Sequence, residues 1–132
     1  MMRYMLDTNT VSSFIKENIA VSKRITSLPM DKLCLSVISE AELLYGLAKK
    51  PHAKNLHKVV QEFLKRIDVL TWDSAVAEQY GNLRAELEAK GNVLGELDMQ
   101  IAAHASQVGA VLVTNDQAFK RVQKLMVEDW TQ

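Results

Sequence analysis

Apolar and polar positions change their period several times along the chain, and these changes predict an α/β fold. Short apolar runs with the length of buried strands lie at residues 3–6, 33–36, 67–70 and 110–113. Between the runs, apolar residues recur every three or four positions, which predicts helices at 19–28, 38–49, 54–66, 74–89 and 97–107, with shorter ones directly after Asp7 and at 116–122. Strands that alternate with helices favour a small, mostly parallel sheet flanked by helices.

Length and composition predict one globular domain that covers residues 1–132. The apolar fraction is 48%, yet no run is long enough to cross a bilayer, and no secretory signal is visible. The lone cysteine, Cys34, cannot form an internal disulfide and is expected to be a small buried side chain. These features lead us to expect a cytoplasmic protein.

The formal net charge is zero, with 16 basic and 16 acidic side chains, which argues against avid nonspecific binding to nucleic acid. The distribution is uneven, because between residues 49 and 66 only Glu62 opposes a basic cluster. This cluster consists of Lys49, Lys50, Lys54, Lys58, Lys65 and Arg66. A smaller basic group lies at 120–124. Each group could hold RNA phosphates or could be a solvated helix face.

Four carboxylates stand at places that a parallel sheet would bring together. Asp7 ends the first apolar run, Glu42 lies in the helix after the second, Asp98 opens the small-residue helix, and Asp116 follows the last run. The carboxyl ends of parallel strands meet at one edge of a sheet, where clustered acids repel one another without a cation. Carboxylates suit Mg²⁺ or Mn²⁺, which can activate water for phosphodiester cleavage.

Each acid also has a purely structural interpretation. Asp7 and Asp116 could cap the helices that follow them, Asp98 could stabilise a helix N-terminus electrostatically, and Glu42 could be solvated. Spacing alone supports a joint site and these separate roles about equally. Glu40 lies two residues from Glu42, so the two side chains point to different faces of their helix.

The remaining residues offer no other catalytic arrangement. The three histidines have no metal-ligand spacing with one another or with Cys34, and neither a Ser-His-Asp arrangement nor a glycine-rich phosphate loop is found. His104 lies in an alanine-rich helix and is expected to be a packed residue or a residue at the rim of a site rather than a catalytic one. Asp73 is expected to cap the helix that follows it, and Asp31 and Asp68 are expected to face solvent.

Four segments carry a resemblance to a known family: Met5–Asn9, Ser39–Gly46, Gly95–Ala105, and Leu112–Asp116 with Phe119. In order and spacing they resemble the PIN-domain ribonucleases, and among these the VapC-type toxins of bacterial type II toxin–antitoxin pairs. The resemblance covers essentially the whole chain. The segment from Leu83 to Gly91 is similar to the enteric subgroup of these toxins.

The resemblance implies a PIN-like α/β fold that binds Mg²⁺ or Mn²⁺ at a cluster of acids and acts as an endoribonuclease. The core metal-site acids of the family match Asp7, Glu42 and Asp98. A fourth, more variable position matches Asp116, where relatives can carry Asn. The family also has polar residues around the acids, and the matching positions are Thr8, Asn9 and Thr114.

The resemblance also implies a substrate and partners. Toxins of the enteric subgroup cut initiator tRNA in the anticodon stem-loop, which would inhibit translation. A homodimer is implied, together with a VapB-type antitoxin that forms a hetero-oligomer and covers the active site with its C-terminal segment. Candidate RNA-binding residues are Lys49, Lys50 and Lys54. Apolar surface for the dimer or the antitoxin, or simply for the core, is expected at Leu43, Leu44, Leu47 and Ala48.

Other classes of protein fit the sequence less well. A dehalogenase-type phosphatase needs a second acid two residues after the first, where this chain has Asn9. A receiver domain needs an acidic pair and a late lysine, where this chain has Thr114, Asn115 and Asp116. A DNA-directed 5′ nuclease uses similar acids but is usually larger. A non-catalytic RNA-binding or interaction module is the alternative from a different class.

Overall fold

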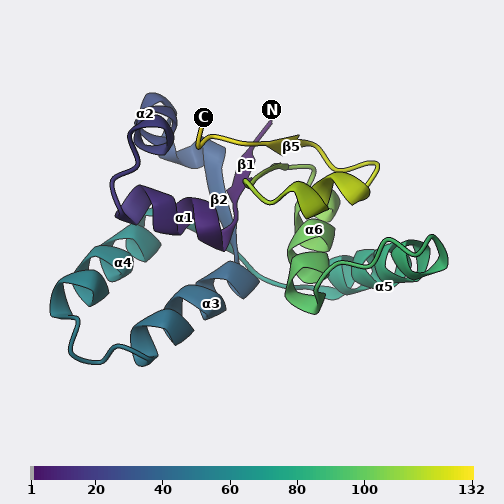
Figure 1. Ribbon diagram of the computed structural model, residues 1–132, viewed down its shortest axis with the longest axis horizontal. Coiled ribbons are helices and arrows are strands. Elements are labelled where there is room, and N and C mark those ends of the chain that lie inside the picture. The colour runs from purple at the N-terminus through teal and green to yellow at the C-terminus, as the bar shows by residue number, and fades with distance from the viewer. Residues whose placement is uncertain (1) are drawn as a thin grey trace.

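The strands form one sheet in which every described pairing is parallel. In the computed structural model, which describes residues 2–132, the strands are β1 (Tyr4–Leu6), β2 (Leu33–Ser36), β3 (Asp68–Leu70), β4 (Val111–Val113) and β5 (Val127–Glu128). Their order is β3-β2-β1-β4-β5, so the first strand of the chain lies at the centre (Figure 1). The expected α/β fold with a parallel sheet is confirmed.

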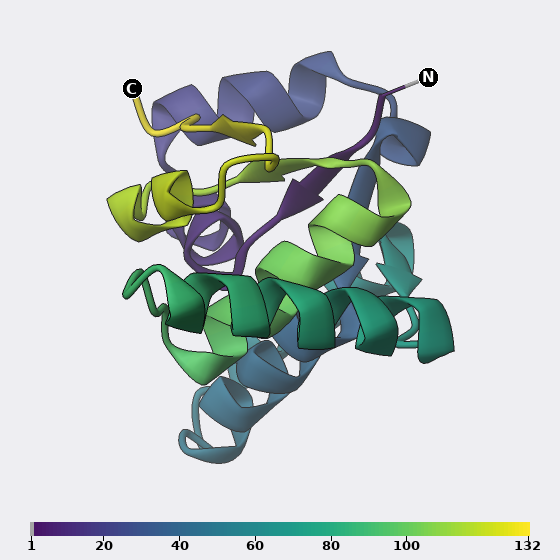
Figure 2. The ribbon, with the colours of Figure 1, turned by 90° about the vertical axis from the view of Figure 1, so that its right-hand side faces the viewer.

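Helices cover both faces of this sheet. They are α1 (Thr8–Ile15), α2 (Ile19–Ser27), α3 (Val37–Ala48), α4 (Lys54–Arg66), α5 (Ser74–Ala89) and α6 (Glu96–Val108), with short 3-10 helices η1 (Met30–Lys32) and η2 (Gln117–Arg121). One side of the sheet carries α1, α2 and α4, and the other carries α5 and α6 (Figures 1 and 2). Helix α3 starts where β2 ends and contacts α1, α4 and α6.

The alternation of side chains along the central strands divides the core in two. Met5, Cys34 and Leu112 belong to the cluster under α5 and α6. The next residues along the same strands, Leu6, Leu35 and Val113, belong to the cluster under α1, α2 and α4. All six side chains are fully buried, which explains why these strands are continuous apolar runs. Burial raises the pKa of the Cys34 thiol to about 11, and its expected role as a small buried side chain is confirmed.

Local signals explain where several helices begin and end. Asp73 caps α5 by accepting a hydrogen bond from the Val76 amide at 2.9 Å, as expected. Ser36 caps α3 in the same way through the amide of Ile38 at 3.1 Å. Helix α6 ends at Gly109, whose φ of 71° lies in the left-handed region that glycine adopts without strain.

Several expectations need correction. The segment 116–122 forms the 3-10 helix η2 rather than an α-helix, and the two-residue strand β5 was not expected at all. By contrast, Asp68 is exposed as expected, and its Oδ2 accepts a hydrogen bond from Arg3 Nη2 at 2.9 Å on the surface. Leu43 and Leu47 are buried in the core, so the spare apolar surface expected on α3 does not include them.

None of the helices that the structure describes combines the length and the apolar character needed to cross a membrane.

Candidate active site

The carboxyl ends of the two central strands bring polar residues together at one edge of the sheet. The Asp7 amide donates to the Val113 carbonyl at 3.0 Å, which extends the pairing of β1 with β4 by one residue. Asp7 and Thr114 therefore follow neighbouring strands and lie side by side. Helix α3 starts from β2, the other neighbour of β1, so all three connections leave the sheet at the same edge (Figure 1).

Asp7 is a buried carboxylate that also caps a helix. Its side chain is 4% exposed, and Oδ1 accepts a hydrogen bond from the Thr10 amide at 2.7 Å, at the N-terminus of α1. Burial raises the pKa of Asp7, hydrogen bonds from Thr114 and Thr10 oppose this rise, and the charge of Asp116 adds to it. The capping interpretation and the site interpretation are therefore both compatible with its position.

Glu42 is held in place from α1. The Thr8 hydroxyl donates to Glu42 Oε1 at 2.7 Å, which ties the start of α1 to the second turn of α3. The contact orients the Glu42 carboxylate and leaves its other oxygen for a further ligand. This contact places Thr8 beside one of the predicted acids, and its role in a metal site stays a prediction.

Asp98 and Asp116 complete the group. Asp98 lies half-buried in the first turn of α6, and its pKa is raised by burial and then by the charges of Asp116, Glu42 and Asp7. Asp116 caps η2 by accepting from the Ala118 amide at 2.9 Å, and its own amide donates to Thr114 Oγ1 at 3.0 Å. The structure therefore places Asp98 within electrostatic reach of the other three predicted acids.

The donor set fits a hard divalent cation, because it consists of carboxylate oxygens at a partly buried edge of the sheet. One oxygen each of Asp7, Glu42 and Asp116 is engaged by a hydrogen bond, which fixes the orientation of these side chains. Across residues 2–132, no three His, Cys, Asp or Glu side chains are already gathered tightly enough to form a metal site. The acids form a loose cluster, and their role as metal ligands stays a prediction.

The other predicted site residues fall into different places. Thr114 is buried between Asp7 and Asp116, whereas Asn9 is exposed and its side chain makes no hydrogen bond within the described part of the chain. Lys49 and Lys50 line a groove that also contains Thr8 and Glu42. Lys54 lines a separate hollow, with Pro51, His57, Lys58 and Lys65 among its residues, that includes none of the four acids.

Thr10 is a supporting residue that the sequence interpretation missed. Its hydroxyl donates to the Val113 carbonyl at 2.9 Å, and its amide donates to Asp7, so it joins α1 to the ends of β1 and β4. Thr10 is buried although it is polar. No local pattern identifies this role, because the partner of the Thr10 hydroxyl, the Val113 carbonyl, lies on another element of the fold.

A second missed feature is a buried hydrogen bond between the end of β2, where α3 begins, and α6. His104 Nδ1 lies 2.7 Å from Ser36 Oγ, and both side chains are fully buried. The Trp72 ring packs edge-on against the imidazole with 5.8 Å between the ring centroids. Of the two expected places for His104, packed or at a rim, the structure shows the packed one. Because Ser36 starts the helix of Glu42 and His104 lies on the helix of Asp98, the pair fixes the two helices relative to each other.

Replacing His104 with Gln should reduce the loss of unfolding free energy that accompanies a fall in pH from 7 to 5. Burial lowers the pKa of His104, with Asp73 and the Thr71 backbone opposing this effect. The unfolded chain therefore takes up the proton more readily, and stability is lost as the pH falls below the ordinary histidine pKa of about 6.5. Unfolding by urea at pH 7 and pH 5 measures this loss in the wild type and in His104→Gln.

The matched control is His52→Gln, because His52 is exposed. It should retain the wild-type difference between pH 7 and pH 5. An equally steep profile in His104→Gln would contradict the assignment. His104→Ala, which also empties part of the core, should cost about 2–4 kcal/mol of unfolding free energy at pH 7.

The match to a family model decides how this arrangement relates to known proteins. Residues 4–125 match the family model of the PIN domain, and this range contains all four acids. The chain belongs to the PIN-domain family. This PIN domain is similar over its full length to proteins named VapC. It is 39% identical over 132 residues to the tRNA(fMet)-specific endonuclease VapC of Shigella flexneri, covering 99% of this chain and 100% of the relative.

Other relatives and solved structures that are similar to this chain also carry the VapC or VapBC name. Ribonuclease VapC2 of Haemophilus influenzae is 39% identical over 132 residues, covering 98% of this chain and 99% of the relative. A chain of the DNA-bound VapBC structure from Salmonella typhimurium superposes with a TM-score of 0.91 at 38% identity, covering 98% and 99% of the two chains. VapBC2 of Rickettsia felis, bound to a promoter DNA fragment, gives a TM-score of 0.89 at 35% identity, with 98% and 99% covered. The resemblance to VapC-type PIN domains is confirmed.

Proposed function

We propose that this PIN domain is the endoribonuclease toxin of a toxin–antitoxin pair and that it requires Mg²⁺ or Mn²⁺. The observation that carries the proposal is the buried Asp7 beside Asp98, Glu42 and Asp116, since such a group of acids is electrostatically unfavourable unless a cation balances it. Relatives that are 39% identical over the full chain are named as ribonucleases. The donor chemistry of the cluster supports the metal requirement.

The four acids would bind the metal ion in two ways. Asp7, Glu42 and Asp98 would bind the ion, and Asp116 would bind it directly or through water. When bound, the ion would lower the pKa of a water molecule and stabilise charge on the phosphate oxygens during attack. Thr8 keeps Glu42 aimed at the cluster by its 2.7 Å hydrogen bond. Burial by the surrounding strands and helices lowers the local dielectric constant, which strengthens each of these interactions.

The proposed substrate is tRNA, with the anticodon stem-loop of initiator tRNA as the leading target. The support is the Shigella flexneri relative, which is named a tRNA(fMet)-specific endonuclease. Lys49 and Lys50, which line the groove beside Glu42, are suited to contact the phosphates on either side of the cut. Cleavage of that tRNA would inhibit translation.

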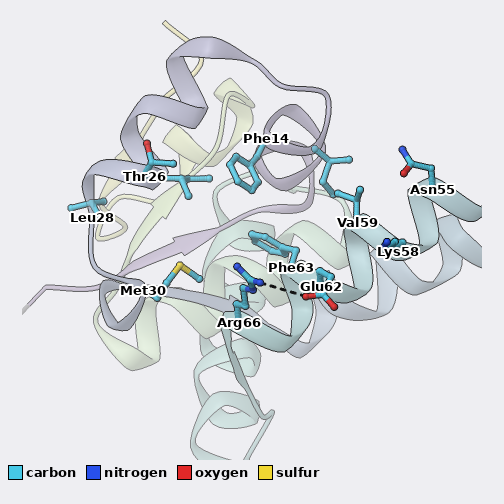
Figure 3. Close-up of a pocket in the computed structure, with 12 residues that line it drawn as sticks. Phe14, Thr26, Leu28, Met30, Asn55, Lys58, Val59, Glu62, Phe63 and Arg66 are labelled. Atoms are coloured by element: carbon cyan, nitrogen blue, oxygen red, sulfur yellow. Dashed lines mark ion pairs between the residues drawn. The ribbon is translucent and has the colours of Figure 1, made fainter.

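A VapB-type antitoxin is the proposed protein partner. The support is an apolar groove of about 650 Å³ between α1, α2 and α4 (Figure 3). The rings of Phe14 and Phe63 meet across it at 5.8 Å between centroids, and the Glu62–Arg66 ion pair lies at its rim. An amphipathic segment can place its apolar face in such a groove. Solved VapC-type relatives occur as VapBC complexes, and a toxin homodimer within such a hetero-oligomer is proposed here as well.

Cleavage of total bacterial tRNA by the purified chain tests the proposed activity. We expect one discrete cut in the presence of Mg²⁺ or Mn²⁺, complete loss of cleavage with EDTA, and recovery when excess Mg²⁺ is returned, with the ends mapped by sequencing. Cleavage that persists in EDTA would contradict the metal requirement. Cleavage of DNA but not RNA would favour a 5′ nuclease, and an intact chain that neither binds metal nor cuts RNA would favour a non-catalytic module.

A further inference from the structure

A second cleft, distinct from the groove of Figure 3, opens directly beside the acid cluster. It has a volume of about 540 Å³ and lies between α3 and the first turn of α6. Its apolar wall consists of Ile38, Ala41, Tyr45 and Leu97. Glu42 and Thr8 also line it, so the proposed metal site and this cleft share a carboxylate and the hydroxyl that orients it.

Tyr45 is the most exposed aromatic side chain near this site. It follows Glu42 by three residues on α3, which places the two on the same side of the helix. The Tyr45 side chain is 64% exposed, whereas Leu43 and Leu47 on the same helix are buried in the core. Packing inside the domain therefore does not explain an aromatic residue at position 45.

Lys49 completes a pair with Tyr45. The Lys49 ammonium lies 4.6 Å from the centroid of the Tyr45 ring, and Lys49 lines both this cleft and the groove on the other side of Glu42. The cation covers one face of the ring. The pair thus offers a flat aromatic surface and a positive charge side by side, next to the carboxylates where a phosphate would be cut.

We propose that Tyr45 and Lys49 form a nucleotide subsite, in which an unpaired base stacks on the Tyr45 ring while Lys49 contacts the adjoining phosphate. The proposal rests on the endoribonuclease function proposed above and specifies the RNA that it takes: a strand with an unstacked base next to the scissile phosphate. Stacking on an aromatic ring tolerates any base, so this subsite selects exposed, unpaired nucleotides rather than a sequence.

The chemistry of the cleft favours a nucleotide over an apolar protein segment. Ile38, Ala41 and Leu97 can contact the faces and edges of a base, while Lys49 and Thr8 provide polar partners at the rim. A protein helix would instead need a continuous apolar surface, and the groove between α1, α2 and α4 offers a larger one. A second copy of this chain seated on Tyr45 is the competing occupant, and it is distinguished by experiment.

The test compares Tyr45→Ala and Tyr45→Phe with Leu44→Ala, using an anticodon stem-loop RNA that carries 2-aminopurine at one loop position at a time. Leu44 is the neighbouring residue on α3, is 45% exposed and does not line the cleft, so it is the matched control. Binding is measured with Mg²⁺ in an Asp7→Asn background, so that the RNA stays uncut, and cleavage kinetics are measured with Asp7 intact.

We expect Tyr45→Ala to raise KM about 5- to 150-fold with kcat little changed, because stacking holds the substrate without taking part in bond cleavage. In the Asp7→Asn chain, stacking on Tyr45 should quench the fluorescence of 2-aminopurine at one loop position of the RNA. That quenching should disappear when Tyr45→Ala is added. Tyr45→Phe keeps the ring and should stay close to the parent chain in both assays, as should Leu44→Ala.

The lysine is tested in the same assays with Lys49→Met against Lys23→Met, since Lys23 is exposed on α2 and lines neither cleft. Lys49→Met should weaken RNA binding and reduce its salt dependence by about one phosphate contact. Sedimentation of each variant reports the oligomeric state. Dissociation of a dimer by Tyr45→Ala, or an unchanged KM in a chain whose parent cuts RNA, would overturn the subsite. If the parent cuts no RNA and binds none, the proposed function fails, and the subsite fails with it.

Discussion

Replacing Asp7 with Asn should reduce RNA cleavage by about 10³-fold or more while the fold stays intact. The substitution keeps the shape of the side chain and its ability to accept the hydrogen bond of the Thr10 amide, so α1 stays capped. It removes the buried negative charge that the proposed site would use to hold a cation. Electrostatic groups at a reacting phosphate have effects of this size because they act in a medium of low dielectric constant.

The same substitution should also stabilise the metal-free protein at neutral pH. Burial raises the pKa of Asp7, so the folded chain holds this proton at pH values where the unfolded chain has released it. The favourable contribution of this group is present at low pH and is lost as the pH rises through the folded-state pKa. Asn carries no charge at any pH, so the Tm of Asp7→Asn measured in EDTA at pH 7 should exceed that of the wild type.

Asp73→Asn is the matched control for both measurements. Asp73 caps α5 through the same type of hydrogen bond, at 2.9 Å to the Val76 amide, but it belongs to no cluster of acids. Its replacement should leave the rate of tRNA cleavage unchanged. Full cleavage by Asp7→Asn would contradict the assignment of the site, whereas loss of cleavage together with unfolding would show that Asp7 matters for the fold instead.

Replacing Val59 with Asp should weaken antitoxin binding on the order of 100-fold or more. Val59 lies on α4 at the groove of Figure 3 and is 39% exposed, so the folded toxin can tolerate a charge there. If an apolar antitoxin segment covers the groove, the same carboxylate is buried without a partner in the complex. Burying an unpaired charge at an interface costs several kcal/mol, which accounts for the expected loss.

Calorimetric titration of the purified VapB-type antitoxin into each toxin variant measures this effect. Val93→Asp is the control, because Val93 is 49% exposed and lies in the loop before α6, outside the groove. The control should bind like the wild type, and both variants should retain cleavage of tRNA. Wild-type affinity in Val59→Asp would move the antitoxin contact to another surface of the toxin.

Much of the fold could be read from local patterns. The strand at 33–36 and the helices at 54–66 and 74–89 have the boundaries that the sequence predicts, because apolar periodicity, a proline or a capping Asp marks each end. The strand β5 was missed because the apolar run Leu125-Met126-Val127 is short and the strand itself has only two residues. It forms only because Thr114 and Leu112 donate hydrogen bonds to the carbonyls of Glu128 and Met126.

For the candidate site, too, the sequence predicted one part and left another to the tertiary structure. The identity of the four acids followed from their positions after strands and at helix starts, together with the family resemblance. Their mutual distances did not, because Asp7 and Asp98 are 91 positions apart and only the strand order brings their elements to one edge. The sequence placed Lys54 with Lys49 and Lys50 in one basic stretch, and the turn between α3 and α4 separates Lys54 from the acids.

By itself, the sequence determined the parallel α/β architecture and the types of residue that could bind a metal ion, since both depend on side-chain period and on order along the chain. Tertiary structure alone decided which polar side chains support the candidate metal-binding residues and the elements that carry them. Thr10, Ser36 and His104 are polar residues whose partners lie on other elements, and their burial depends on contacts that no local pattern encodes. The same reason applies to Tyr45, since its helix is predictable but its 64% exposure is a property of the folded surface.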